Sequence, residues 1–371
     1  MERRDHQMRP LRSRDLTRHS GPVPVTLRHW EPAPRHAGDR DGIIGDGIKE
    51  DGINGGSIGD AQRQEPSHAS LGPALTDAQF HFFGRLAYEH AGIVIADFKR
   101  SMVLHRVQKR LKALNLRSVE HYRRLLNSRD GHAEIEPLIN ALTTNKTSFF
   151  REAHHFDHLR DVALPEIIRR KRAEQTTRIR LWSAGCSTGE EAWSIAMTVD
   201  GMLSAVDATG HVRTGHDRNA HERTGPGSAA HAWDVKILAT DIDSEVLATA
   251  VAARYEPSDT APLSSGLKHR YLEPSADQRN GHHDIVPDLK HLVTFKQLNL
   301  HDEWPFQGPF DVIFCRNVVI YFDRAAQRQL FDRFASVLCI GGLLYCGHSE
   351  SLLSLSSRFR PVSRSVYERI A

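Results

Sequence analysis

One stretch of the chain, Ile179 to Met197, limits the possible folds more than any other. It reads IRLWSAGCSTGEEAWSIAM. Its first residues form an apolar run short enough for one buried strand, and its last residues have the pattern of a helix. The loop between them consists of small residues, and its glycines allow the backbone to approach a ligand closely. A strand, a glycine-rich loop and a helix in this order are typical of the first unit of a nucleotide-binding α/β sheet.

The same loop disfavours phosphate-bearing ligands. No lysine follows Gly189, as a Walker loop requires, and the glycine spacing is not G-x-G-x-x-G. Glu190 and Glu191 begin the helix, where the helix dipole favours negative charge, and we expect Ser187 or Thr188 to cap it. S-adenosylmethionine suits such a site because it has a sulfonium, an ammonium and a ribose but no phosphate. An ordinary strand-to-helix turn of an α/β enzyme explains the loop alone equally well.

Composition sets wider limits. The 371 residues are enough for two domains with tails, and the net charge of +3 is only weak support for a nucleic-acid partner. The four cysteines show no C-x-x-C spacing, so the sequence predicts neither a metal site nor a disulfide framework. No apolar run has the length of a membrane span, and the N-terminus has no apolar signal core. We therefore expect a cytoplasmic protein with reduced thiols.

The composition also divides the chain into segments. Residues 1–73 are rich in Arg, His, Pro, Gly and Asp, which predicts a disordered, low-complexity leader. Residues 74–144 have helical periodicity and predict a small all-α domain, whose first helix is capped by Thr76 or Asp77. Residues 145–175 are expected to form a linker between this domain and the next.

Residues 176–371 alternate strands and helices, as an α/β domain does. The segment 209–232 is rich in Gly, His and Arg and is interpreted as a flexible insertion. Strand and turn signals at 254–290, with Asn280-Gly281 as a hairpin turn, predict a small β-subdomain. A helix is expected from Asp323 to Leu338, with Gly341-Gly342 as the residues that stop it. Four further buried strands are predicted, at 235–240, 292–295, 310–315 and 343–346.

Polar residues follow several of these strands, where ligands bind in open α/β sheets. Asp241 ends the second strand, and an acid there commonly binds ribose hydroxyls. Upstream, the segment LTTNKTSFFREAHHF mixes polar and aromatic residues. This segment either packs as a linker between two domains or closes over a bound cofactor.

The helix from about Phe98 to Leu114 is strongly basic outside its apolar stripe. A solvated surface is the usual meaning of such a pattern, and a docking surface for an acidic partner is the alternative. On the second interpretation, Arg106 and Arg110 are exposed and contact the partner. The basic residues of this helix are Lys99, Arg100, Arg106, Lys109, Arg110 and Lys112.

Five motifs, in order and in spacing, resemble the chemotaxis protein-glutamate O-methyltransferases of the CheR type. They are TTNKTSFFRE, WSAGCSTGEEAWSIA, LATDID, FDVIFCRNVVIYF and GGLLYCGHSES. The resemblance extends from Thr76 to the C-terminus, interrupted at 209–232. It implies an all-α domain followed by a class I S-adenosylmethionine-dependent methyltransferase (Rossmann-like) domain with a β-subdomain. It further implies a monomer that methylates glutamates on the cytoplasmic helices of chemoreceptors, meets the membrane only through them, and binds no nucleic acid.

The resemblance also implies roles for individual residues. Arg151 and Tyr321 correspond to positions beside the transferred methyl group. Two alternatives stay open: a methyltransferase of this fold that acts on a nucleic acid or a small molecule, and a non-catalytic signalling protein that binds S-adenosylmethionine. The intact motifs disfavour the second. The implied cofactor contacts are Asn145, Thr147, Arg151, Glu191, Asp241, Asn299, Leu300, Arg316 and Asn317.

Overall fold

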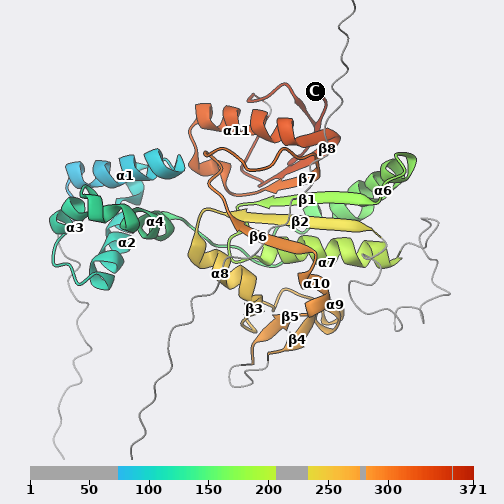
Figure 1. The fold of residues 1–371 in the computed structure, drawn as a ribbon, viewed down its shortest axis with the longest axis horizontal. Coiled ribbons are helices and arrows are strands. Elements are labelled where there is room, and N and C mark those ends of the chain that lie inside the picture. Colours follow the sequence, from blue (N-terminus) through green and yellow to red (C-terminus); the bar gives the residue numbers. More distant parts are fainter. Residues whose placement is uncertain (1–73, 206–232, 276–280, 353) are drawn as a thin grey trace, which may run out of the picture. The chain divides into compact units, whose positions relative to one another are not determined.

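The computed structural model describes residues 74–205, 233–275, 281–352 and 354–371 (Figure 1). The predictions made for residues 1–73, for the 209–232 insertion and for Asn280 lie outside these ranges. Within them, no helix is long and apolar enough to cross a membrane.

The N-terminal part is the expected all-α domain. A capping box at Thr76 starts the first helix, and Gly92 ends it in the left-handed conformation, with φ at 65°. The helices enclose a core around Phe83, Tyr122 and Leu138, all of which are fully buried. The helices are α1 (Asp77–Ala91), α2 (Arg100–Ala113), α3 (Val119–Leu126) and α4 (His132–Leu142), with a 3-10 turn at Asp97–Lys99 before α2.

The basic residues of α2 were expected to form an exposed surface. This prediction is wrong for Arg106 and Arg110, which are partly buried and bind other residues of the chain. Arg110 donates two hydrogen bonds of 2.8 Å to the carboxylate of Glu134, which also accepts the hydroxyl of Tyr122. Arg106 donates to the carbonyl of Leu142 and to a threonine hydroxyl. Both arginines therefore hold α2 against the rest of the domain, because a guanidinium has enough donors to join several acceptors at once.

The C-terminal part is built on a seven-stranded sheet in the order β6-β2-β1-β7-β8-β10-β9. The first five strands in this order are parallel, and β10 is antiparallel to both of its neighbours. The strand order reverses between β1 and β7, the point at which such sheets form a ligand crevice. The strands are β1 (Arg178–Ala184), β2 (Asp234–Asp241), β6 (Val293–Gln297), β7 (Phe310–Cys315), β8 (Leu338–Cys346), β9 (Phe359–Ser363) and β10 (Val366–Arg369).

Helices cover both faces of this sheet (Figure 1). Alternate residues of β1 belong to two separate cores: Ile179 and Leu181 pack on the side of α7, and Trp182 packs on the side of α11. The range interpreted as a linker contains three helical segments, which contribute to the first core. The helices are α5 (His154–His158), a π-helical turn (Leu159–Ala163), α6 (Leu164–Ala173), α7 (Glu190–Ala205), α8 (Ser244–Ala252) and α11 (Arg324–Val337).

A second, three-stranded sheet lies where the β-subdomain was expected. Its order is β3-β5-β4, and both pairings are antiparallel. Tyr271 and Arg270 attach it to α7, since both donate to Asp200 Oδ2 at 2.9 Å. Its elements are β3 (Arg254–Tyr255), α9 (Ser265–Tyr271), β4 (Leu272–Pro274), β5 (His283–Ile285) and α10 (Pro287–Lys290).

The helix stop predicted at Gly341-Gly342 is wrong. α11 ends at Val337, and β8 begins at the next residue and runs through both glycines. The register with β7 shifts there, since Phe310 pairs with Leu338 whereas Val312 pairs with Leu343. Gly341 has φ at 73°, a conformation that glycine adopts without strain. The two glycines therefore form part of a bulge in β8 and do not end the helix.

Candidate functional site

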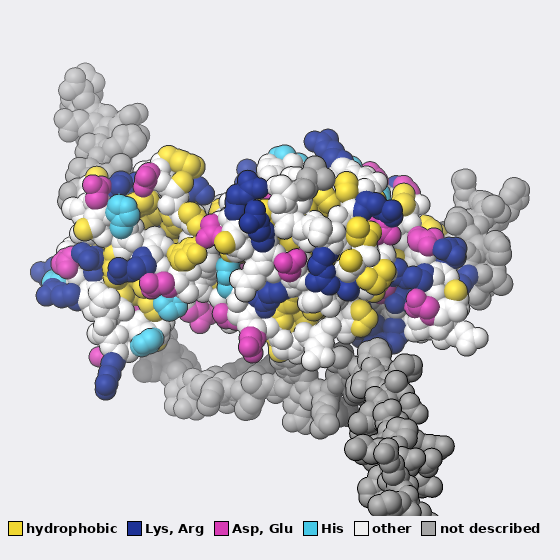
Figure 2. Space-filling view, turned by 90° about the horizontal axis from the view of Figure 1, so that it is seen from above, with side chains coloured by type: hydrophobic (Ala, Val, Ile, Leu, Met, Phe, Trp, Pro, Cys, Tyr) yellow, Lys and Arg dark blue, Asp and Glu magenta, His cyan; other side chains and the backbone are white. Residues whose placement is uncertain are grey.

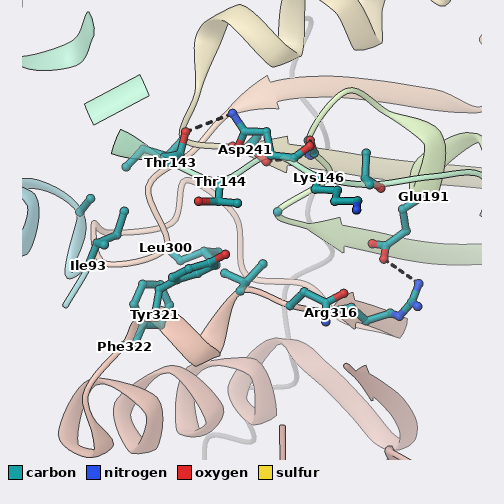
Figure 3. A pocket seen from close by; sticks show the side chains of 18 of the residues that line it. Ile93, Thr143, Thr144, Lys146, Glu191, Asp241, Leu300, Arg316, Tyr321 and Phe322 are labelled. Atoms are coloured by element: carbon teal, nitrogen blue, oxygen red, sulfur yellow. Dashed lines mark hydrogen bonds and ion pairs between the residues drawn. The ribbon is translucent and has the colours of Figure 1, made fainter. Parts of the chain in front are cut away.

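A pocket lies at the carboxyl ends of β1, β2 and β7, where the strand order reverses (Figure 3). All of the residues predicted to contact a cofactor or the transferred group line it, although they come from five separate stretches of sequence. They are Asn145, Thr147, Arg151, Glu191, Asp241, Asn299, Leu300, Arg316, Asn317 and Tyr321.

The loop after β1 forms part of the pocket wall. Gly185 has φ at 86°, and a Cβ at this position would lie 2.3 Å from a methyl group of Val318, so only glycine fits. Ser187 and Thr188, expected to cap α7, use their hydroxyls elsewhere. Ser187 donates to the carbonyl of Asn145 at 2.8 Å, and Thr188 donates to Glu190 at 2.7 Å. The first of these bonds attaches the 145–151 segment to the loop.

Glu191 and Arg316 form a buried ion pair inside the pocket (Figure 3). Arg316 Nη1 donates to Glu191 Oε2 at 3.1 Å, and Ser183 Oγ donates to the other carboxylate oxygen at 2.7 Å. Burial raises the pKa of Glu191, while the charge of Arg316 and the bond from Ser183 oppose that shift. The pair fixes the direction of both side chains at the first turn of α7.

Glu152 lies on the far side of Arg316 and extends this chain of charges. Its carboxylate is 3.4 Å from Arg316 Nη2, and it accepts a bond of 2.9 Å from His348 Nδ1. Burial alone would raise the pKa of Glu152, but His348 and Arg316 lower it to about 2. Glu152, His154 and His155 bring three potential metal ligands within 4.8 Å of one another. The adjacent guanidinium of Arg316 disfavours a cation there.

Asp241 ends β2, as predicted, and its carboxylate is held by the backbone. Ser187 N donates to Oδ2 at 2.8 Å, and Asp243 N donates to Oδ1 at 3.0 Å. Burial raises the pKa of Asp241 against the effect of these two bonds. The carboxylate therefore has a fixed orientation and keeps lone pairs for hydroxyl donors in the pocket.

Two of the predicted asparagines already have protein partners for their amide hydrogens. Asn145 Nδ2 donates to Asp243 Oδ2 at 2.6 Å, and Asn299 Nδ2 donates to the carbonyl of His90 at 2.8 Å. Asn299 thereby attaches the end of α1 to the pocket wall. In this structure both side chains shape the walls. Asn299 Oδ1 also accepts His301 N at 3.1 Å and keeps one lone pair for a ligand.

Glu350, which lies in the motif GGLLYCGHSES, fixes the position of Asn317. The buried carboxylate of Glu350 accepts the backbone N–H groups of Asn317 and Val318 at 2.9 Å and that of Gly347 at 2.6 Å. Burial raises the pKa of Glu350 against these bonds. One acid thus holds the loop that presents Arg316 and Asn317.

Sequence reasoning missed several lining residues. Lys146 is exposed at the pocket, and Ile93 reaches it from the all-α domain. The glycine before Ile93 is the sequence feature that could have indicated this position. In the structure, a Cβ at Gly92 would lie 1.9 Å from the ring of His301, which follows the pocket-lining residues 299–300. Only glycine permits that close approach of the helix end. The signal for Lys146 was its place inside the motif TTNKTSFFRE.

The charged residues that line the pocket differ in exposure, and the buried cation Arg316 is paired with Glu191. The acids are buried: Glu191 lies in the first turn of α7, and Asp241 ends β2. The cations Lys146 and Arg151 are more exposed, and Lys99 places its ammonium 5.0 Å from the ring centroid of Tyr321. Buried acids suit a ligand with an ammonium and a sulfonium, and exposed cations suit an anionic partner. The carboxylates of Glu191 and Asp241 therefore fit S-adenosylmethionine in the inner part of the pocket.

Comparisons with known proteins also support a site for S-adenosylmethionine. Residues 78–143 match the model of the CheR methyltransferase all-alpha domain, and residues 145–221 and 226–367 match that of the CheR methyltransferase SAM binding domain. The chemotaxis protein methyltransferase of Escherichia coli strain K12 is 40% identical over 295 residues, which are 79% of this chain and 91% of that protein. The probable chemotaxis protein methyltransferase of Rhizobium etli is 40% identical over 265 residues, which are 71% of this chain and 89% of that protein.

These matches, together with the strand order, confirm the predicted all-α domain, the class I methyltransferase domain and the cofactor. The chain belongs to the CheR methyltransferase family and is an S-adenosylmethionine-dependent methyltransferase.

Proposed function

We propose that the enzyme methylates glutamate side chains on the cytoplasmic helices of chemoreceptors and so forms glutamate methyl esters for sensory adaptation. Two cations that line the pocket carry this proposal, because the exposed Lys146 and the partly exposed Arg151 can attract an anionic acceptor. The relatives named chemotaxis protein methyltransferases support the choice of acceptor. We further infer that the enzyme acts as a cytoplasmic monomer and meets the membrane only through the receptors.

Nucleic acid is the less favoured acceptor. On the face drawn in Figure 2, Lys and Arg side chains are interspersed with Asp and Glu over the surface that the structure describes. Nucleic-acid-binding proteins usually gather their basic side chains in one patch or stripe. The net charge of +3 is also small for a chain of 371 residues.

The residues that would hold the cofactor follow from their chemistry. Asp241 would accept the ribose hydroxyls, and Glu191 would face the cationic amino-acid end or its water shell. Leu300 is buried in the wall and would cover an apolar part of the ligand. When bound, S-adenosylmethionine supplies a methyl group whose carbon bonds to the carboxylate oxygen while its bond to sulfur breaks, which leaves neutral S-adenosylhomocysteine.

The residues of the enzyme then have mainly a positioning role. A glutamate has a reference pKa near 4.3, so the acceptor is already an ionised nucleophile at neutral pH and needs no general base. Arg151 donates one bond to the carbonyl of Lys146 at 2.8 Å, and its remaining N–H groups can orient the carboxylate together with the hydroxyl of Tyr321. In-line positioning and exclusion of water can lower such a barrier by up to roughly 7–11 kcal/mol.

A transfer assay tests the proposal. The enzyme is incubated with methyl-labelled S-adenosylmethionine and a purified chemoreceptor cytoplasmic fragment. We expect label in the fragment that alkali releases as methanol, which is the behaviour of an ester. Arg151→Ala should slow transfer strongly, whereas Arg169→Ala, a change on an exposed part of α6, should not. Alkali-stable label, or label only in RNA or a small molecule, would contradict the proposed acceptor.

A further inference from the structure

Exposed apolar side chains are concentrated beside the pocket. Among the described residues, nine large apolar side chains are exposed. Four of them lie in two segments, 88–98 and 320–322, that also contain residues lining the pocket. We name these four the apolar rim: Tyr88, Val94, Phe98 and Ile320. Phe98 is 82% exposed, the highest value among the nine. Scattered apolar residues are normal on a protein surface, but a cluster at the edge of a site marks an interaction surface.

Direct contacts join the two segments of the rim. Val94 N donates to the carbonyl of Tyr321 at 2.8 Å, which places the 93–98 segment against residues 320–321. Tyr88 donates its hydroxyl to Asp323 at 2.9 Å. These bonds connect residues more than two hundred positions apart in the sequence, so the rim exists only in the folded chain.

The rim continues into the pocket. Figure 3 shows Ile93, Leu300, Tyr321 and Phe322 together at one end of the pocket, with Glu191 at the other. Ile93 and Tyr321 are the chain neighbours of rim residues Val94 and Ile320. A partner that rests on the rim can therefore also place a side chain in the pocket.

The rim carries a positive charge at its centre. The ammonium of Lys99 lies 6.0 Å from the ring centroid of Phe98 and 5.0 Å from that of Tyr321. The side chain of Lys99 thus spans the gap between an exposed aromatic ring and a pocket-lining one. A cation between two aromatic faces suits a partner that presents both acidic and apolar groups on one side.

We propose that the apolar rim binds the acceptor segment itself, as an amphipathic acidic helix. Apolar side chains on the same helix face as the target carboxylate rest on Phe98 and Ile320, and acidic neighbours meet Lys99. Side chains three or four positions apart share one face of a helix, which lets one helix fill both the rim and the pocket. This inference rests on the proposed function, since it takes the acceptor to be a glutamate-bearing helix.

The test compares two double variants. Phe98→Ser with Ile320→Ser removes the centre of the rim, and Val251→Ser with Ile340→Ser removes apolar side chains of similar exposure on α8 and β8. We expect the rim variant to raise the KM for the chemoreceptor fragment by about tenfold or more, as the loss of central interface residues does. The control variant should keep the wild-type KM. The affinity for S-adenosylmethionine, measured by calorimetry, should be the same in all three proteins.

Direct binding of the fragment separates this inference from the proposed function. Weaker binding to the rim variant than to wild type and control supports the rim as the docking surface. Equal binding to all three proteins, or no binding to wild type, overturns it. Absence of methyl transfer by a wild-type enzyme that binds the fragment through the rim instead overturns the proposed reaction and leaves the docking surface in place.

Discussion

Arg316 Nη1 lies 3.1 Å from Glu191 Oε2, and this buried contact joins the loop after β7 to the first turn of α7. Both side chains line the pocket, and Arg316 is also 3.4 Å from Glu152. A charge in such a position depends on its partner, because removal of one member leaves the other buried and uncompensated. Arg316 therefore supports the fold and shapes the pocket at once.

Loss of Arg316 should destabilise the protein. We expect Arg316→Leu to lower the free energy of unfolding by about 3–5 kcal/mol, because Glu191 would remain buried without its partner. Chemical denaturation measures this change. Adding Glu191→Leu to the variant should recover part of the loss, since the two substitutions act on one contact. Strictly additive effects would show that the two side chains do not stabilise each other.

Substitution of Asp241 should weaken cofactor binding. We expect Asp241→Ala to raise the Kd for S-adenosylmethionine by at least about tenfold, since a hydrogen bond to a charged group contributes about 1.5–3 kcal/mol. The variant should also melt earlier, because the N–H groups of Ser187 and Asp243 lose their acceptor. Asp311→Ala is the control: it removes another buried acid, which pairs with Arg170 away from the pocket lining. Wild-type affinity in a folded Asp241 variant would remove this residue from the site.

Charge reversal on α2 should lower stability at Arg110, which binds Glu134, but should affect only the methylation rate at the exposed lysines. Arg110→Glu should lower the free energy of unfolding by about 3 kcal/mol or more, because it places a second carboxylate against Glu134. Lys109 and Lys112 are exposed. Lys109→Glu with Lys112→Glu should keep the wild-type melting temperature but slow methylation of a glutamate-rich fragment.

Salt provides the check on this electrostatic effect. The difference between wild type and the double lysine variant should shrink as salt increases, because exposed charges are screened within about 8–10 Å at physiological ionic strength. Equal methylation rates at low salt would show that these lysines only keep the helix soluble.

His155 should make the stability of the enzyme depend on pH. Burial, aided by the positive charge of Arg316, lowers the pKa of His155 to about 3. The unfolded chain has a histidine pKa near 6.5, so it binds more protons than the folded chain between these values. The contribution of His155 is therefore complete above about pH 6.5 and is lost as the pH falls toward 3.

The measurement compares the melting temperatures of wild type and His155→Gln between about pH 7.5 and 5. We expect the variant to lose less stability over this range than wild type does, because glutamine does not titrate. Buried acids with raised pKa, such as Glu191, act in the opposite direction in both proteins, so the difference isolates His155. Parallel curves would contradict the effect.

The N-terminal leader should be dispensable for catalysis. Trp30 is its only Phe, Tyr or Trp residue, which is too few for a packed core. We expect deletion of residues 1–70 to leave the melting temperature and the rate of methyl transfer nearly unchanged. A large loss of thermal stability would show instead that this segment packs on the methyltransferase.

Local patterns in the sequence were sufficient to predict the main strands and to place the pocket at their carboxyl ends. Asp241 and Arg316 directly follow apolar strands, and parallel strands bring their carboxyl ends to one edge of the sheet. All ten residues that the resemblance implicated line one pocket. Whether each of them contacts the cofactor stays a prediction.

The errors arose where a long-range contact decides the role of a residue. Arg106 and Arg110 have the spacing of a solvated surface, but partners on α4 and after it bind them. Gly341 lies where a helix could end, but pairing with β7 needs a bulge there. Ile93 belongs to the all-α domain, and long-range contacts bring it to the pocket: Gly92 packs closely on His301, and Val94 N donates to the carbonyl of Tyr321. No local pattern contains these partners.

The central claim is that the acceptor is a glutamate carboxylate, and mass spectrometry of the methylated acceptor tests it most directly. A chemoreceptor cytoplasmic fragment is incubated with the enzyme and S-adenosylmethionine and then sequenced by fragmentation. We predict added methyl groups on glutamate side chains of its helices, and no addition when those glutamates are replaced by alanine. Methyl groups on any other residue type, or an unmodified fragment beside a methylated nucleic acid or small molecule, would contradict the account.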